Sequence, residues 1–140
     1  MSAAGKIAQL TRVVLRPGIW SDRFHDQAHG IPHDEPCDLP EVLRSRIASG
    51  TAHVAEIVTA SGAVGFIVYS LAFAGREFVL VAGYGRDGRN LTDEVKPQVE
   101  ALARSLGCSS VRFHTMRPAL VLAAVAAGYH VGEIILRKHL

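Results

Sequence analysis

Along the chain, stretches in which apolar residues recur with helical spacing alternate with stretches that have the pattern of β-strands. Apolar residues recur every three or four positions over 39–49 and again over 95–106, which predicts two amphipathic helices. Between these helices lie three apolar runs, at 52–60, 63–73 and 77–84, separated by short turns that contain glycine. Such consecutive runs indicate an antiparallel meander of three strands.

The flanking segments complete an α/β pattern. A first strand is predicted at 12–15, a short strand at 111–114, a small-residue helix at 118–127 and a last strand at 129–139. The helix that precedes 111–114 predicts a right-handed crossover between parallel strands. We therefore expect an α/β fold, in which a mixed β-sheet carries helices on both faces.

The first quarter of the chain has no long periodic stretch. Prolines and glycines interrupt 17–40, so this stretch cannot form one long helix or strand. We expect an irregular N-terminal arm over 1–37, followed by a single globular domain over 38–140. Three large apolar residues of the arm could anchor it, either on its own domain or on a neighbouring protein subunit: Ile19, Trp20 and Phe24.

Length and composition narrow the class of protein without giving a function. The 140 residues suffice for one domain with a sizeable core. A net charge of +2, from 15 basic and 13 acidic residues, does not indicate a nucleic-acid partner. No apolar run is long enough for a membrane span, so no membrane partner is expected. The two cysteines form no disulfide framework and suit a reducing compartment.

The C-terminal half carries a distinctive series of motifs. A helix ends in Leu-Gly-Cys at 106–108, and after a strand a second helix ends in Gly-Tyr at 128–129. Over about 39–140, this order resembles the GNAT superfamily, the acetyltransferases that use acetyl-coenzyme A (acetyl-CoA). The closing Arg-Lys-His-Leu at 137–140 is similar to the ends of small GNAT-like proteins encoded by bacteriophages and prophages.

The resemblance places the coenzyme A diphosphate on the turn after the central strand. Family members carry Gln/Arg-x-x-Gly-x-Gly/Ala there, and its backbone N–H groups bind the phosphates. Four residues of this turn would hold the coenzyme: Gly85, Arg86, Gly88 and Arg89. The turn departs from the pattern, because Gly85 replaces the polar first residue and Asn90 the small last one. Asp87 also adds a negative charge near the phosphates.

The resemblance also implies a proton donor and an acyl-binding gap. Many GNAT enzymes carry a tyrosine one turn before the Gly-Tyr position, but here that residue is Ala124, which cannot donate a proton. Tyr129 follows the glycine and is expected in the core. Tyr84 is the candidate catalytic residue if the chain is an enzyme. Gly83 and Gly85 flank it, which predicts a bulge or a close approach of strands beside the gap.

A run of potential metal ligands lies in the N-terminal arm. Its members recur every four residues: His25, His29, His33 and Cys37. Histidine and cysteine are ordinary zinc ligands. However, Gly30 and two prolines interrupt the helix that would align them. The spacing also differs from that of zinc modules, so no metal site is expected.

Two functions remain open. The first, favoured by the departures at Asp87, Asn90 and Ala124, is a non-catalytic binding or structural component that needs no cofactor. Its setting, by resemblance, would be a phage virion or its assembly, in the host cytoplasm or the particle. Its partners would be other protein subunits, including virion proteins contacted through the N-terminal arm. The alternative is an acetyl-CoA-dependent N-acetyltransferase of unknown acceptor.

Overall fold

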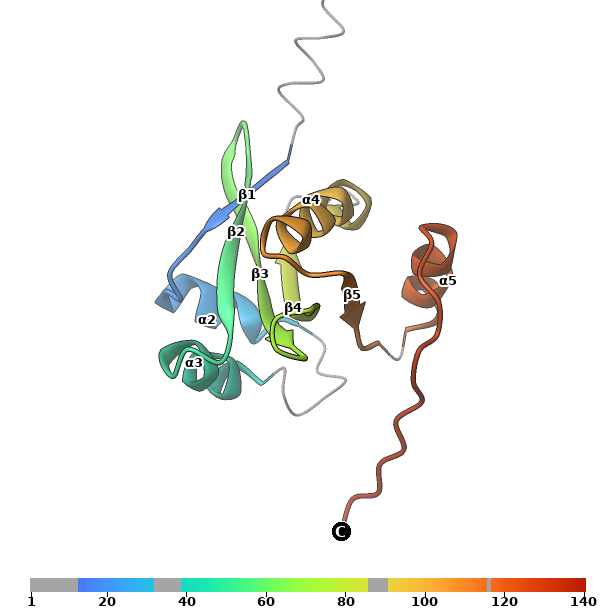
Figure 1. Ribbon diagram of the computed structural model, residues 1–140. Helices are drawn as coiled ribbons and strands as arrows, with labels where there is room; N and C mark the ends of the chain where they lie inside the picture. Colours follow the sequence, from blue (N-terminus) through green and yellow to red (C-terminus); the bar gives the residue numbers. More distant parts are fainter. Residues whose placement is uncertain (1–12, 32–38, 86–90, 116) are drawn as a thin grey trace, which may run out of the picture.

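The computed structural model describes residues 13–31, 39–85, 91–115 and 117–140. In chain order, its elements are β1 (Val14–Pro17), α2 (Asp22–Ala28), α3 (Pro40–Ala48), β2 (His53–Thr59), β3 (Gly62–Ala72), β4 (Glu77–Gly85), α4 (Leu91–Ser105), β5 (Ser110–Phe113) and α5 (Pro118–Ala126). The strands form one sheet in the order β1-β2-β3-β4-β5. Neighbours from β1 to β4 are antiparallel, whereas β5 runs parallel to β4 (Figure 1).

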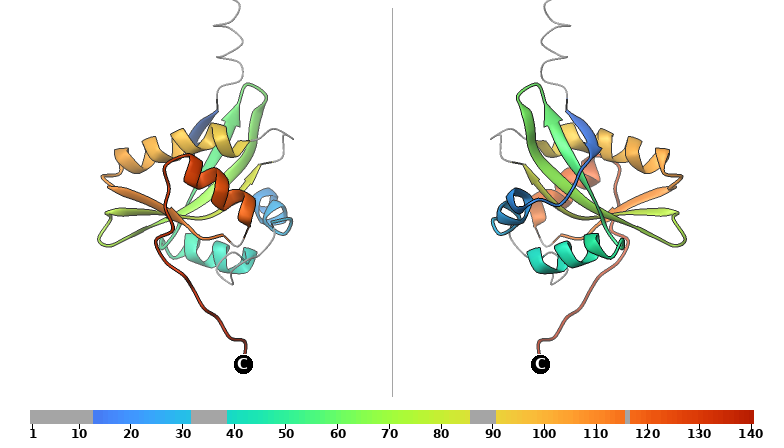
Figure 2. Two further views of the ribbon diagram at one scale, coloured as in Figure 1. Left: turned by 90° about the vertical axis from the view of Figure 1, so that its right-hand side faces the viewer. Right: turned by 90° about the vertical axis from the view of Figure 1, so that its left-hand side faces the viewer.

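The sheet separates two layers of buried apolar side chains. On one face, α4 packs against the sheet, with Val99 and Ala103 next to Ile57 and Phe78. On the opposite face, α2 and α3 cover a second cluster that includes Phe66. Figure 2 shows the sheet between α4 and these two shorter helices. Successive strand residues point to opposite faces, so the central strands β2, β3 and β4 each supply both layers. The predicted α/β fold with helices on both faces is confirmed.

Two regular elements lie within 1–37, where an irregular arm was expected. Strand β1 pairs with β2 at the edge of the sheet. Helix α2 begins after Ser21, whose hydroxyl accepts a hydrogen bond from the backbone N–H of Phe24 at 3.2 Å. This N-cap satisfies a helix-end donor, and the helix buries Phe24 and Ala28. The sequence did not reveal α2, because only eight residues separate its cap, Ser21, from the following Gly30.

The aromatic residues of the N-terminal arm pack on their own domain. The rings of Trp20 and Phe24 lie 5.3 and 4.8 Å from the ring of Phe66, measured between centroids. Phe66 is fully buried in the sheet. The intramolecular anchor is therefore present in the structure, while Ile19 is 85% exposed. A protein partner for the arm stays a prediction.

The predicted last strand is wrong. Residues 129–140, which we call the C-terminal tail, are extended but form no strand. A strand requires a neighbour for its backbone N–H and C=O groups, and the tail has no register with β5. Its apolar side chains are consequently exposed, Ile134 to 83% and Leu136 to 90%. Within the described residues, no helix has the length and apolar character needed to cross a membrane.

Candidate functional site

Strands β4 and β5 part from each other after a short parallel ladder. Only Glu77–Leu80 and Ser110–Phe113 are paired. Beyond this ladder β4 continues to Gly85, held by β3, whereas β5 ends. Among the described residues, the backbone of 81–85 therefore has no strand partner on the side that faces β5. A gap opens in the middle of the fold.

A bulge on β4 coincides with the start of the gap. The register between β3 and β4 shifts between Val68 and Tyr69, which leaves Val81 as an extra residue on β4. A bulge bends and twists its strand, so it turns β4 away from β5. The sequence suggested such an irregularity around Gly83, two residues farther along. The bulge itself needs no glycine, which is why the glycine signal missed its position.

The close approach of two strands occurs at Gly65 on β3. A Cβ atom at this position would overlap the carbonyl oxygen of Tyr84 and would lie 2.9 Å from the Cα of Gly85. Only glycine therefore lets β3 and β4 meet here. At Gly83, by contrast, a Cβ would make ordinary contact, at 3.8 Å from Cγ2 of Ile67. The requirement for glycine therefore lies at the end of β4, whose residues Tyr84 and Gly85 border the gap.

A pocket of about 290 Å³ lies in the opening between β4 and β5. We call it the gap pocket. Its inner wall is apolar and comes from β2, β3, β4, α4 and β5: Ile57, Ile67, Leu80, Val95, Val99 and Val111. Its polar residues come mainly from the ends of strands and helices: Tyr84, Lys96, His114, Thr115, Arg117 and Tyr129. No carboxylate lines it among the described residues. An apolar slot with a few polar groups suits a small ligand with an apolar reactive end.

Two tyrosines line the gap pocket. Tyr84, the predicted candidate, is half-buried and stacks on Phe66 at 6.0 Å between centroids. Tyr129, expected in the core, is also half-buried, with its ring edge-on to Phe113 at 5.6 Å. Burial, and to a lesser extent the charge of Glu100, raises the pKa of the Tyr129 phenol. At neutral pH this phenol therefore carries a proton that it can donate.

The position that the resemblance assigns to a tyrosine holds no donor. Ala124 is buried, and its carbonyl accepts a hydrogen bond from the backbone N–H of Tyr129 at 3.0 Å. Nearby, Nζ of Lys96 donates to the carbonyl oxygen of Ala123 at 3.4 Å and lies 3.6 Å from a carboxylate oxygen of Asp93. Lys96 thus ties α4 to α5 at the edge of the gap pocket.

The phosphate-binding turn predicted after β4 falls largely outside the described residues. Gly85 closes β4 and lines the gap pocket. The other three candidates, Arg86, Gly88 and Arg89, belong to 86–90 and are not described. Their role in holding a coenzyme stays a prediction. The structure brings together Tyr84 and Gly85 of the predicted site.

Sequence reasoning missed His114 and Thr115 at the gap pocket. It placed His114 inside a strand over 111–114, whereas β5 ends at Phe113. The residues after a parallel strand gather at the carboxyl edge of the sheet, where α/β proteins place their ligands. A polar pair directly after a short parallel strand was the available signal.

The candidate metal ligands of the N-terminal arm do not form a described site. His33 and Cys37 lie outside the described residues. In the described part of the chain, no three metal-ligating side chains come together. Trp20 Nε1 donates a hydrogen bond to Nδ1 of His25 at 3.3 Å. In the neutral imidazole this places the proton on Nε2, the nitrogen that a metal ion would need.

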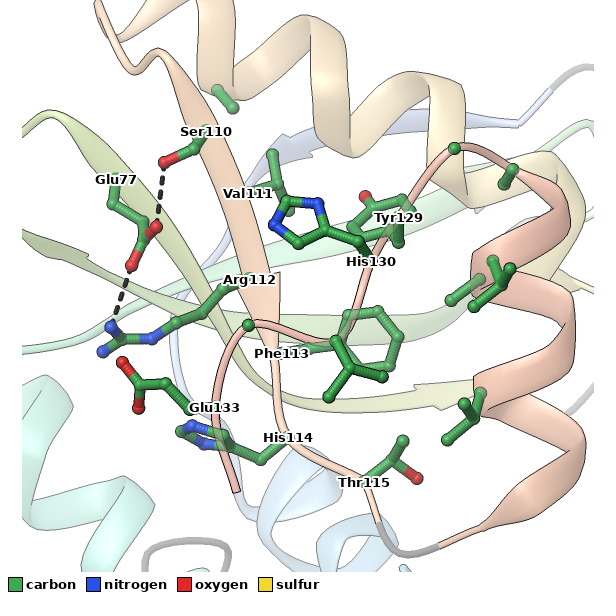
Figure 3. A pocket seen from close by; sticks show the side chains of 18 of the residues that line it. Glu77, Ser110, Val111, Arg112, Phe113, His114, Thr115, Tyr129, His130 and Glu133 are labelled. Carbon is green, nitrogen blue, oxygen red and sulfur yellow. Dashed lines mark hydrogen bonds and ion pairs between the residues drawn. The ribbon is translucent and has the colours of Figure 1, made fainter. Parts of the chain in front are cut away.

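A larger groove of about 670 Å³ lies between β5, α5 and the C-terminal tail (Figure 3). On its β5 side, Nη1 of Arg112 lies 2.8 Å from a carboxylate oxygen of Glu77. The hydroxyl of Ser110 donates to the other carboxylate oxygen at 2.9 Å. We call this opening the tail groove, and it is distinct from the gap pocket, although Tyr129 lines both.

The raised pKa of Tyr129 predicts a measurable loss of stability in alkali. The unfolded phenol ionises near pH 10, before the folded one, so the free energy of unfolding falls as the pH rises above about 10. In Tyr129→Phe this contribution is absent. Urea unfolding at pH 8 and pH 11 should show a smaller loss for the variant than for the wild type. Equal losses would contradict the burial of this phenol.

Comparisons with known proteins agree on the fold. No protein-family model and no curated protein matches the sequence. Among solved structures, a putative acetyl transferase from Pyrococcus furiosus matches with a TM-score of 0.64 and 9% identity, over 92% of this chain and 100% of that chain. A predicted acetyltransferase from Clostridium acetobutylicum, solved with acetyl-CoA, matches with a TM-score of 0.61 and 9% identity, over 91% and 96%.

A third structure, glucosamine-6-phosphate N-acetyltransferase from Arabidopsis thaliana, matches with a TM-score of 0.60 and 14% identity, over 91% of this chain and 97% of that chain. At these identities the matches establish the fold alone. The chain therefore has the fold of GNAT acetyltransferases, as the sequence resemblance implied.

Proposed function

We propose that this chain is an acetyl-CoA-dependent N-acetyltransferase whose acyl group enters the gap pocket. The observation that carries the proposal is the separation of β4 from β5, which opens an apolar pocket in the middle of an acetyltransferase-like fold. The similarity to acetyltransferase structures, one of them solved with acetyl-CoA, supports it. The acceptor amine stays unassigned.

The residues of the gap pocket fit such a group. The backbone of 81–85 on β4 has no strand partner on the β5 side among the described residues. These N–H and C=O groups can pair with amides of an extended ligand, as a strand edge pairs with a peptide. The apolar inner wall suits an acetyl group. The turn at 85–90 is the proposed diphosphate site.

Because Ala124 has no hydroxyl, the two tyrosines that line the gap pocket are the candidates for proton transfer. When bound, acetyl-CoA would supply an activated thioester carbonyl. Tyr84 remains the proposed catalytic residue, since it lines the gap pocket at the end of β4. The protonated phenol of Tyr129 is a second donor at the same pocket.

The non-catalytic alternative has less support. Two of its three arguments, Asp87 and Asn90, lie outside the described residues, and the third, Ala124, removes one proton donor from a pocket that has two phenols. The compared structures support the acetyltransferase better. No observation of the structure or the comparisons concerns a phage or a virion, so that setting stays a prediction.

The direct test is binding of acetyl-CoA to the full chain. At about one hundred times its dissociation constant, the ligand should raise the free energy of unfolding by about 2.7 kcal/mol, measured by urea unfolding. In Gly83→Leu, a side chain fills the gap pocket beside Ile67 without a backbone clash. We expect the affinity, measured by calorimetry, to fall at least about tenfold.

The matched control is Ala101→Leu, which adds the same side chain on the exposed side of α4, away from the gap pocket. It should bind acetyl-CoA like the wild type. Release of free coenzyme A in the presence of an amine panel then tests transfer. Absence of binding at millimolar acetyl-CoA, or equal affinity of Gly83→Leu and Ala101→Leu, would overturn the proposal.

A further inference from the structure

A primary amine lies at the wall of the gap pocket. The chain has three lysines, Lys6, Lys96 and Lys138. Lys96 lines the gap pocket from α4, Lys138 is exposed in the C-terminal tail, and Lys6 lies outside the described residues. Arg117 also lines the pocket, but a guanidinium keeps its proton in proteins and does not act as a nucleophile. Among the described lining residues, Lys96 therefore carries the amine that can react with an acyl group.

The structure holds this amine beside the pocket and largely out of solvent. The side chain of Lys96 is 18% exposed. Its Nζ donates to the carbonyl oxygen of Ala123 at 3.4 Å and lies 3.6 Å from a carboxylate oxygen of Asp93. Both distances exceed the roughly 2.7–2.9 Å of a strong contact between an ammonium group and an oxygen. A rotation of the flexible side chain can therefore exchange these contacts for a ligand in the gap pocket.

The small size of the gap pocket brings this amine and an acyl group together. The volume of about 290 Å³ is at the lower end of the range for ligand pockets, and the inner wall is apolar. An acyl group that enters the gap pocket therefore shares it with Lys96. Reactants held in one site react faster, by several orders of magnitude when well oriented, than the same groups in solution.

We propose that Lys96 takes the acetyl group of acetyl-CoA bound in the gap pocket, so that the chain modifies its own pocket. The inference rests on the proposed function, because it needs the acyl group in the gap pocket. Nζ of Lys96 first loses a proton to the carboxylate of Asp93 or to solvent, and then attacks the thioester carbonyl. The N–C bond forms and the C–S bond breaks, with the electron pair leaving on sulfur. A second Nζ proton goes to the thiolate, and the third stays on the amide nitrogen.

Acetylation changes the edge of the gap pocket in two ways. It removes the positive charge of Lys96, so the ion pair with Asp93 is lost. It also leaves an acetamide at the pocket that a second acyl group has to enter. The modified chain should therefore bind acetyl-CoA at least about tenfold more weakly, which makes the modification self-limiting.

Labelling of the full chain with deuterated acetyl-CoA tests the proposal. Peptide mass spectrometry at early times gives separate labelling rates for Lys96 and Lys138. Reaction in free solution favours the exposed Lys138, whereas reaction inside the gap pocket favours Lys96. We expect Lys96 to be labelled at least about tenfold faster than Lys138. In urea, which unfolds the chain, this preference should disappear because both lysines are then equally accessible.

Two leucine variants provide matched controls for the labelling. Gly83→Leu fills the gap pocket and should lose the preference for Lys96, whereas Ala101→Leu, on the exposed side of α4, should keep it. Equal labelling rates of Lys96 and Lys138 in the wild type, or a preference that survives in Gly83→Leu or in urea, would overturn the inference.

Calorimetry separates this inference from the proposed function. If acetyl-CoA binds and Gly83→Leu weakens the binding, the proposed function stands, and a missing label on Lys96 overturns the inference alone. If acetyl-CoA does not bind, both fall. After labelling and removal of the ligand, the affinity of the wild type for acetyl-CoA should drop, while Lys96→Arg treated in the same way should keep its own affinity. An unchanged affinity of the labelled wild type would overturn the self-limiting role.

Discussion

Gly65→Ala should destabilise the protein by about 3–5 kcal/mol, at the upper end of single substitutions. The added Cβ would overlap the carbonyl oxygen of Tyr84, and the Cα of Gly85 lies 2.9 Å away. Both obstacles are backbone atoms of β4, so no flexible side chain can move aside. Strands β3 and β4 must separate at the point where β4 borders the gap pocket. Urea unfolding monitored by circular dichroism measures the loss.

The same β-ladder provides a matched control. Gly83→Ala, on β4, adds a Cβ that meets Ile67 at an ordinary 3.8 Å. Its backbone is not in the left-handed region, so the change should alter stability by less than about 1 kcal/mol, and the lower entropy of the unfolded chain favours a gain. Equal effects of the two substitutions would show that the strands do not approach closely at Gly65.

Phe66→Ala should cost about 3–5 kcal/mol, as expected when a buried phenylalanine is truncated to alanine. Phe66 is fully buried, and its ring contacts those of Trp20, Phe24 and Tyr84 at centroid distances of 5.3, 4.8 and 6.0 Å. The cavity would weaken the packing of Trp20 and Phe24, which anchor the N-terminal arm. It would also remove the ring on which Tyr84 stacks. Equilibrium unfolding measures the first effect. The affinity for acetyl-CoA, measured at a temperature at which the variant is still folded, reports the second effect.

Phe73 is the appropriate control for Phe66. It is 68% exposed at the turn between β3 and β4, and its ring lies 5.8 Å from the guanidinium of Arg112. Phe73→Ala removes this cation–π contact and little buried area, so the loss should stay below about 1 kcal/mol. A comparable loss in both variants would contradict the central place of Phe66 in the core.

The central strands could be predicted from the sequence almost to the residue. The expected run at 77–84 became β4 (Glu77–Gly85), and the run at 52–60 became β2 (His53–Thr59). These segments are continuous apolar runs bounded by turns, so local pattern and tertiary burial agree. The parallel pairing of β5 with β4 could be predicted because a helix, α4, separates the two strands in the sequence.

Features that depend on distant contacts could not be predicted. The end of β5 at Phe113 depends on its divergence from β4, so the polar pair that follows is only a weak signal for it in the sequence. The bulge at Val81 arises from the register with β3, which no local pattern encodes. The tail has strand-like residues but no neighbour in the structure, so its propensity predicted a strand that is absent.

The single tryptophan of the chain, Trp20, allows the packing of the N-terminal arm to be measured by fluorescence. Its indole is half-buried against Phe66, which in turn stacks on Tyr84 at the gap pocket. Tryptophan emission therefore has one source, located where the N-terminal arm meets the sheet. A change in the packing of Trp20, caused by release of the N-terminal arm or by a shift of Tyr84 and Phe66, should therefore change the wavelength of the tryptophan emission. This change can be followed in real time without a label.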